Sequence, residues 1–278
     1  MRGLFQNIQL LFACLFKVIN YKKIFIILDI INLKSLTATK YKIIILVFFL
    51  LSKINAQKIE SKEKKTNDLE PAIIVPGNFS SPPSDAIVLF DGSNFSHWHH
   101  SKSKKPVRWI LNNDKSFTIK PGTGYIETRE EHESVQLHIE WKSPIENKGE
   151  GQTRGNSGIF FQGRYEVQVL NSYHNGTYPD GQAGSIYKQY IPLVNSMRPT
   201  GEWQVYDIVF NAPKYNNSGD IIKSGSCTVF HNGVLIQNNV EIKRPTMSIE
   251  KDTRKTLMLQ DHDKNGTVSY RNIWMRKI

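Results

Sequence analysis

The sequence predicts an all-β protein built as a sandwich of two antiparallel sheets. From residue 84 onward the apolar segments are short and are separated by turn residues. Several of them alternate apolar and polar residues, which is typical of strands with one buried face. No segment shows an apolar repeat of helical period over a useful length. Many short strands with regular turn signals indicate a β-sandwich.

Seven segments are predicted to form strands. They are residues 86–90, 134–142, 165–170, 203–210, 227–238, 256–262 and 268–278. The second, SVQLHIEWK, alternates apolar and polar residues throughout. The Asn232-Gly233 pair within the fifth segment predicts a type I′ hairpin turn. Among the aromatic residues, Trp141 and Trp274 are assigned to the core.

The same period of two places polar side chains on the outer faces of the sheets, because each strand of a sandwich gives only one face to the core. For the predicted strand at residues 256–262, either set of alternate residues could face the core. We prefer the arrangement in which Leu257 and Leu259 are buried and Gln260 points outward. The outward residues predicted in this way are His138, Glu140, Glu166, Gln168, Gln260 and His262. Carboxylates and carboxamides on an outer face are suited to a ligand rich in hydroxyl groups.

The net charge of +11 belongs mostly to the N-terminal part of the chain. Residues 1–56 hold eight basic residues and one acid, a balance of +7, so residues 57–278 carry only +4. A nucleic-acid-binding surface needs clustered Lys and Arg on the folded part, and the sequence shows no such stripe. Nucleic acid is therefore not an expected partner. Residues 57–278 contain one cysteine, Cys227, which excludes an intramolecular disulfide and a thiolate metal cluster there.

Residues 1–56 are predicted to be a leader that ends in a secretory signal peptide. A basic KYK stretch precedes an apolar h-region at residues 43–51, and cleavage is expected after Ala56. The apolar runs fall short of the roughly 20 residues of a membrane-spanning helix, so an uncleaved leader is the only expected route to a membrane. Residues 57–83 read as a flexible linker and residues 84–278 as the β-sandwich domain. We expect an exported protein, periplasmic, extracellular or at the cell surface.

Several motifs, in this order, resemble the 3-keto-disaccharide hydrolase family. They are LFDGSNFSHW (89–98), GNSGIFFQGRYEVQVLNSY (155–173), GEWQVYDIVFNAP (201–213), TVFHNGVLIQN (228–238), LQDH (259–262) and YRNIW (270–274). The resemblance covers about residues 84–278. It implies a concanavalin A-like, glucanase-like jelly roll, exported from bacterial cells, that cleaves glycosides whose sugar carries a ketone at C3. The chain departs from the family pattern at Asn171, where relatives often carry an acid, and at Thr200 and Asp263.

A ketone at C3 makes the hydrogen on C2 acidic, so a base can remove it and the group on C1 leaves by β-elimination. Addition of water then gives net hydrolysis. Such a site needs a base, a partner for the C3 oxyanion and an acid for the leaving oxygen. Jelly-roll glucanases place their two carboxylates on one strand as E-x-D-x-x-E, and the matching stretch here has Glu166, Gln168 and Asn171. The missing second carboxylate argues against a conventional glucanase.

The candidate site residues follow from this chemistry. Glu166 and Glu140 are candidates for the base, and His262 for the acid or the oxyanion partner. The predicted substrate-binding residues are Asn156, Gln168, Gln260, Tyr187, Trp203 and Arg271. Tyr173 and Tyr178 are further candidates for stacking on a sugar. For Glu140 and Arg271 the alternative is an ion pair across the sheet.

A divalent cation, Ca²⁺ or similar, held by His262 and Glu166 would stabilise an enolate, although no compact ligand spacing requires one. The predicted function is cleavage of a 3-keto-glycoside or 3-keto-disaccharide. The alternative is a lectin-like carbohydrate-binding module without catalysis, because the fold alone does not separate the two. The expected partner is a small oligosaccharide or keto-glycoside, and no pattern in the sequence sets an oligomeric state.

Overall fold

The computed structural model describes residues 53, 71–78, 81–146, 148–247, 255–262 and 267–278. The chain divides into two units, Met1–Ile73 and Ile74–Ile278, and every named strand lies in the second. Apart from Lys53, the predicted signal peptide lies outside the described residues, and its boundaries stay a prediction. Within the described ranges no helix is long and apolar enough to span a membrane.

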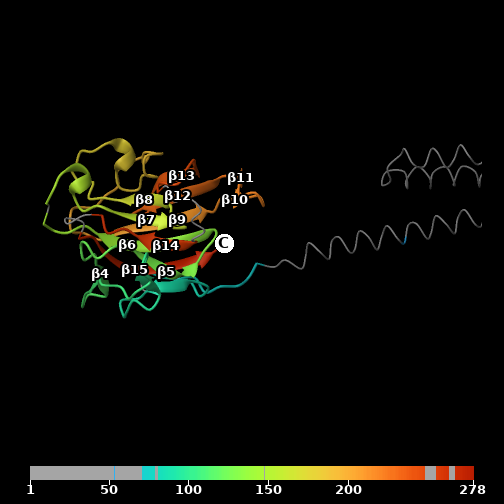
Figure 1. Ribbon diagram of the computed structural model, residues 1–278, viewed down its shortest axis with the longest axis horizontal. Helices are drawn as coiled ribbons and strands as arrows, with labels where there is room; N and C mark the ends of the chain where they lie inside the picture. The colour runs from blue at the N-terminus through green and yellow to red at the C-terminus, as the bar shows by residue number, and fades with distance from the viewer. Residues whose placement is uncertain (1–52, 54–70, 79–80, 147, 248–254, 263–266) are drawn as a thin grey trace, which may run out of the picture. The chain divides into compact units, whose positions relative to one another are not determined.

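The strands of the second unit form two large antiparallel sheets (Figure 1). The eight-stranded sheet contains, in spatial order, β13 (Val234–Ile242), β12 (Gly225–His231), β9 (Gln204–Asn211), β6 (Val135–Lys142), β15 (Ser269–Lys277), β4 (Ser116–Thr118) and β3 (Ile110–Leu111), with β1 (Ile87–Phe90) also paired to β15. The five-stranded sheet contains β2 (Trp98–His100), β5 (Ile126–Glu131), β14 (Thr256–Leu259), β7 (Ser157–Phe161) and β8 (Tyr165–Val169). A separate ribbon joins β10 (Lys214–Tyr215) and β11 (Ile221–Lys223), and two short 3-10 turns span Gly151–Thr153 and Pro179–Gly181.

One hydrophobic core lies between the two large sheets. Strands β6 and β9 alternate buried and half-buried residues along their whole length, so each gives one face to the core. The core side of the eight-stranded sheet includes Leu137 and Trp141, and that of the five-stranded sheet includes Ile159 and Val167. Strands that follow one another in sequence change sheets repeatedly: β5 to β6, β6 to β7, β8 to β9 and β14 to β15. This crossing confirms the predicted jelly-roll sandwich.

Two predicted local features have different outcomes. The hairpin between β12 and β13 is confirmed, because Asn232 and Gly233 have φ values of 54° and 81°, as a type I′ turn requires. The assignment of Trp274 to the core is wrong. A register shift in β15, with Asn272 at a φ of 46°, turns Trp274 to the outer face, where its ring stacks on His138 with 5.1 Å between centroids.

Candidate active site

Strand β8 places two polar side chains on the outer face of the five-stranded sheet. Val167 and Val169 belong to the core, so Glu166 and Gln168 point the other way. Both are nevertheless buried, with only 4% of Glu166 and 1% of Gln168 exposed. Residues 184–187 continue the sheet beyond β8, because their backbone hydrogen-bonds along its free edge.

Gly158 on β7 forms the floor beneath the Glu166 carboxyl. It faces Gln168 on one side, and on the other its carbonyl accepts the backbone N–H of Gln260 at 3.1 Å. A Cβ added to Gly158 would lie 2.4 Å from Oε1 of Glu166, far inside van der Waals contact. The glycine therefore leaves the space that the carboxyl occupies. Because β7 lies between β8 and β14, the two glutamine backbones are about 10 Å apart, with this floor between them.

The carboxamides around the floor are held by hydrogen bonds but keep free acceptors. Nε2 of Gln168 donates to Oε1 of Gln152 at 3.1 Å and to Oδ1 of Asn156 at 3.3 Å. Nε2 of Gln260 donates to the Tyr125 hydroxyl at 3.2 Å. The Oε1 atoms of Gln168 and Gln260 are buried and accept no hydrogen bond within the described part of the chain. A buried acceptor without a donor costs about 1–3 kcal/mol, so a ligand that brings hydroxyl donors would be stabilised here.

Glu166 has the electrostatic character of a base. Its carboxyl makes no hydrogen bond or ion pair with any described residue. Its neighbours in register across β7 and β14 are Phe160 and Met258, neither of which carries a charge. Burial alone raises the pKa of Glu166 from 4.5 to about 8. A carboxyl with a pKa near the working pH is more basic than an ordinary one once it is deprotonated.

His262 lies three residues beyond the end of β14 and is exposed. The preferred phase of this segment is confirmed, because Leu257 and Leu259 belong to the core. The pair proposed to hold a divalent cation, His262 and Glu166, therefore combines an exposed group with a buried one. Across the described ranges no three His, Cys, Asp or Glu side chains come together as a metal site. Cation binding by this pair stays a prediction.

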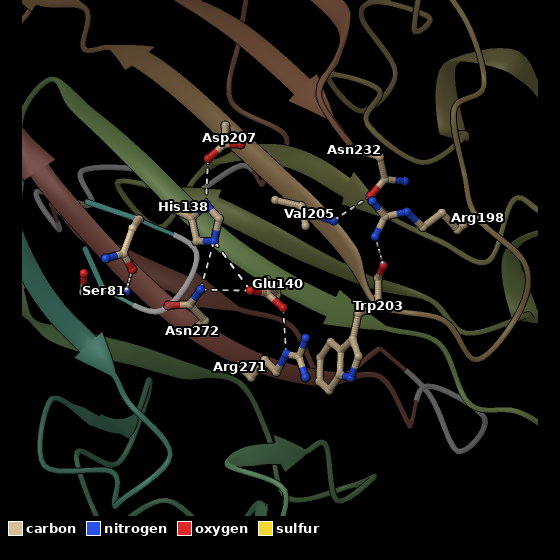
Figure 2. A network of polar contacts seen from close by, with 11 residues as sticks. Ser81, His138, Glu140, Arg198, Trp203, Val205, Asp207, Asn232, Arg271 and Asn272 are labelled. Atoms are coloured by element: carbon tan, nitrogen blue, oxygen red, sulfur yellow. Dashed lines mark hydrogen bonds and ion pairs between the residues drawn. The ribbon is translucent and has the colours of Figure 1, made fainter. Parts of the chain in front are cut away.

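Glu140 lies on the other sheet, in a polar network on the outer face of β6, β9 and β15 that Figure 2 shows. Its Oε2 accepts a hydrogen bond from Nε of Arg271 at 2.6 Å, and its Oε1 accepts one from Nδ2 of Asn272 at 2.8 Å. Nδ1 of His138 bonds Oδ1 of Asp207 at 2.7 Å. Glu140 therefore forms the ion pair with Arg271 that was the alternative interpretation of both residues.

This network fixes the charges of its members. Burial by itself would raise the pKa of Glu140, but hydrogen bonds from His138, Asn272 and Arg271 lower it to about 2. Burial would likewise lower the pKa of His138, but its bonds to Asp207 and Glu140 raise it to about 9. Both groups are ionised at neutral pH and both are engaged, which makes Glu140 a poor base.

The structure separates the predicted site residues into two groups. Trp203 lies beside Glu140, because the guanidinium of Arg271 sits 4.1 Å and the ammonium of Lys142 4.6 Å from its ring centroid. The outer faces of the two sheets are on opposite sides of the core, and packed sheets are about 10 Å apart. The structure therefore does not bring Glu140, Trp203 or Arg271 to Glu166. The predicted residues on the five-stranded side are Glu166, Gln168, Asn156, Gln260 and Tyr187.

The hydrogen-bonded side chains of Gln168, Asn156, Gln152, Gln260 and Tyr125 are called the amide cluster below. Two of them, Gln152 and Tyr125, were not predicted to belong to the site. Gln152 lies in the 3-10 turn that precedes β7, and its backbone carbonyl accepts Nδ2 of Asn156 at 2.7 Å. Tyr125 comes directly before β5, whose sequence IETREE has no clean alternation. One sequence feature could have pointed to Gln152: it lies in the glycine-rich stretch GEGQTRGNSG, and the glycines allow the backbone to turn beside the site.

Comparisons with known proteins agree with this description. Residues 85–276 match the 3-keto-alpha-glucoside-1,2-lyase-like domain, which confirms the family resemblance. A crystal structure from Parabacteroides distasonis ATCC 8503, described as a "putative glycosyl hydrolase", is 43% identical, has a TM-score of 0.70 and matches over 76% of this chain and 93% of its own. A second structure with the same description and organism is 18% identical, with a TM-score of 0.52 over 70% and 94% of the two chains, and shows the fold alone. No curated protein matches the chain.

Proposed function

Because the chain belongs to the 3-keto-alpha-glucoside-1,2-lyase-like domain family, we propose that it cleaves 3-keto-glycosides on the outer face of its five-stranded sheet. One observation carries the proposal: the Glu166 carboxyl is buried over Gly158, makes no ion pair with any described residue, and has a pKa of about 8. Such a group is suited to removing a proton from carbon next to a carbonyl. The coarser conclusion, a carbohydrate-active protein, agrees with the description of the 43% identical relative as a glycosyl hydrolase.

In this reaction Glu166 acts first as the base and then as the proton donor at C2. The ionised carboxylate takes the proton from C2 of the sugar, and the electron pair of the C–H bond forms the enolate of the C3 ketone. When the enolate collapses, the C1–O bond breaks and its electron pair leaves on the aglycone oxygen, which is protonated. After the aglycone leaves, the carboxyl proton of Glu166 exchanges with solvent. Water then adds its hydroxyl to C1, and Glu166 protonates C2. The balance is one keto-glycoside and one water giving a keto-sugar and an alcohol.

The amide cluster has the donors and acceptors to hold the sugar above this carboxyl. The two unfilled acceptors, Oε1 of Gln168 and Oε1 of Gln260, flank the Gly158 floor and would accept sugar hydroxyls. Because both amides are already oriented by bonds to Asn156 and Tyr125, little side-chain freedom is lost when the ligand binds.

A conventional retaining glycosidase needs two carboxyl groups about 5–5.5 Å apart. The positions next to Glu166 in register are Phe160, Met258 and the backbone partner Tyr187, and the next outward residue on β8 is Gln168. None of these supplies a second carboxylate. The arrangement therefore favours an elimination, which needs one base, over direct displacement.

The proposal is tested with a 3-keto-glucoside that carries a chromogenic leaving group and with the same glucoside without the ketone. We expect release from the keto compound alone, and loss of that release in Glu166→Gln. The matched control is Glu140→Gln, which removes a carboxylate from the opposite face and should keep the activity. Repeating the assay after chelation, with Ca²⁺ added back, tests the predicted cation. Release from both glucosides at similar rates would contradict the proposal. Binding of the sugar without any release would favour the lectin-like alternative.

We also propose that the protein is exported, on the signal-peptide pattern at residues 40–56. The test is N-terminal sequencing of the protein recovered outside the cytoplasm of its host. A mature chain that begins at Gln57 is the expected result, and a chain found only in the cytoplasm with its leader intact would contradict it.

A further inference from the structure

A short strand-like segment brings Tyr187 directly beside Glu166. Ile186 forms an antiparallel bridge with Val167, and both side chains belong to the core. The residues that flank this bridge, Tyr187 and Glu166, therefore face each other and point to the opposite, outer side. Their backbones are joined by a hydrogen bond from the N–H of Tyr187 to the carbonyl of Glu166 at 3.2 Å. Facing residues of antiparallel strands have Cβ atoms about 4.5–5.5 Å apart, so the phenol and the carboxyl line one site.

A second tyrosine holds the Tyr187 hydroxyl. The hydroxyl oxygens of Tyr187 and Tyr178 are 2.7 Å apart, so one phenol proton lies between them and the other is free to point into the site. The ring of Tyr178 is seated tightly, because a Cβ on Gly181 would lie 2.0 Å from its Cε2. The ammonium of Lys188 lies 3.1 Å from the Tyr178 ring centroid and pairs with Asp180 at 3.7 Å. Burial and the Tyr187 hydroxyl raise the pKa of Tyr178, with further contributions from Asp180 and Glu166, so the tyrosine pair stays protonated until the leaving oxygen takes a proton.

The geometry of β-elimination requires an acid close to the base. The hydrogen on C2 and the leaving oxygen on C1 are on adjacent carbons, so the group that takes the proton and the group that gives one must be a few ångströms apart. The facing pair Glu166 and Tyr187 satisfies this requirement. His262, by contrast, is exposed beyond the end of β14.

Resting on the proposed function, we propose that Tyr187 is the catalytic acid, that it donates its phenol proton to the leaving oxygen, and that Tyr178 positions it. The electron pair of the breaking C1–O bond takes the Tyr187 proton and leaves as the alcohol, and a phenolate remains. When water adds to C1, its proton passes to that phenolate, and Glu166, whose proton has exchanged with solvent, protonates C2. The balance consumes no net proton, oxidant or cofactor.

The test compares two 3-keto-glucosides that differ only in their leaving group, 4-nitrophenol and methanol. Nitrophenolate leaves without a proton, whereas methoxide does not. We expect Tyr187→Phe to lose about a hundredfold or more of kcat/KM on the methyl compound, which is the usual range of acid catalysis, and less than about fivefold on the nitrophenyl compound. Glu166→Gln should lose activity on both, because C2 deprotonation precedes either departure.

Matched variants keep the test decisive. Tyr190→Phe removes a phenol oxygen three residues away, where the ring packs under Lys243 at 4.6 Å, and should leave both substrates unchanged. Tyr178→Phe should also lose more kcat/KM on the methyl compound than on the nitrophenyl compound, although the loss should be smaller than in Tyr187→Phe. If Tyr187→Phe does not fold, this variant provides the test. Equal losses on the two substrates, or none on either, would overturn the role of Tyr187 while the proposed function stands. A wild-type protein inactive on both compounds would overturn the proposed function itself, and this inference with it.

Discussion

Replacing Glu166 by Gln should remove a pH-dependent cost to folding. The carboxyl is 4% exposed, and its pKa in the folded protein is about 8 instead of 4.5. Because the folded-state pKa is raised, the folded protein holds its proton more tightly than the unfolded chain does. The carboxyl therefore costs no stability below about pH 4.5, and the cost grows as the pH rises toward 8 and levels off above it.

The magnitude follows from the two pKa values. Each pH unit between them changes the free energy of unfolding by about 1.36 kcal/mol, so between about pH 5 and about pH 9 wild type should lose about 4 kcal/mol relative to Glu166→Gln. The measurement is the free energy of unfolding from urea titrations of both proteins over this range.

Glu140→Gln is the control for this measurement. The pKa of Glu140 is lowered to about 2, so the stability that its charge provides is present above the unfolded value of 4.5 and is lost only as the pH falls below it. Its curve should therefore run parallel to wild type over the same range. Parallel curves for wild type and Glu166→Gln as well would refute the assignment of an unpaired, buried carboxyl.

Three further predictions follow from the same contacts. The kcat/KM of wild type on a 3-keto-glucoside should rise with pH and level off above about 8, because Glu166 must be ionised to act as a base; a rate that falls over this range would contradict that role. Gly158→Ala should lower kcat/KM by about a hundredfold, since the new Cβ displaces the carboxyl, whereas Gly176→Ala, with no atom within 4 Å of its added Cβ, should change neither activity nor thermal midpoint. Glu140→Gln should lower the free energy of unfolding by about 1–3 kcal/mol, measured by urea titration, and leave kcat/KM unchanged; a large loss of activity would mean that the eight-stranded face takes part in the reaction.

The long, regular strands could be predicted because each is buried on one side only. Strands β6 and β9 show this directly: every second residue is buried and the others are half-buried. Some short strands were not found in this way. All five residues of β7 are buried, because the outer face of the five-stranded sheet is itself covered, and its sequence SGIFF shows no alternation. Two-residue strands such as β3 are too short to show a period.

The face of a side chain could be predicted, but not the sheet on which it lies. Alternation correctly turned Glu166 and Gln168 outward, yet it also turned Glu140 outward and gave no sign that β6 and β8 belong to different sheets. That information lies in strand pairing, which depends on contacts between residues far apart in sequence. The error at Trp274 has a local cause, because one extra residue at the bulge in β15 reverses the phase for every residue after it.

The central claim, that Glu166 removes the proton from C2, is tested most directly by running the reaction in deuterated water and locating deuterium in the sugar product by mass spectrometry and NMR. Elimination followed by addition of water breaks and remakes the C2–H bond, and the proton on the Glu166 carboxyl exchanges with solvent between the two steps. We therefore expect deuterium at C2 of the 3-keto-sugar released by wild type, at a level above that of the same sugar incubated with Glu166→Gln. Cleavage by wild type that leaves C2 fully protonated is the result expected of direct displacement at C1, and it would contradict the account.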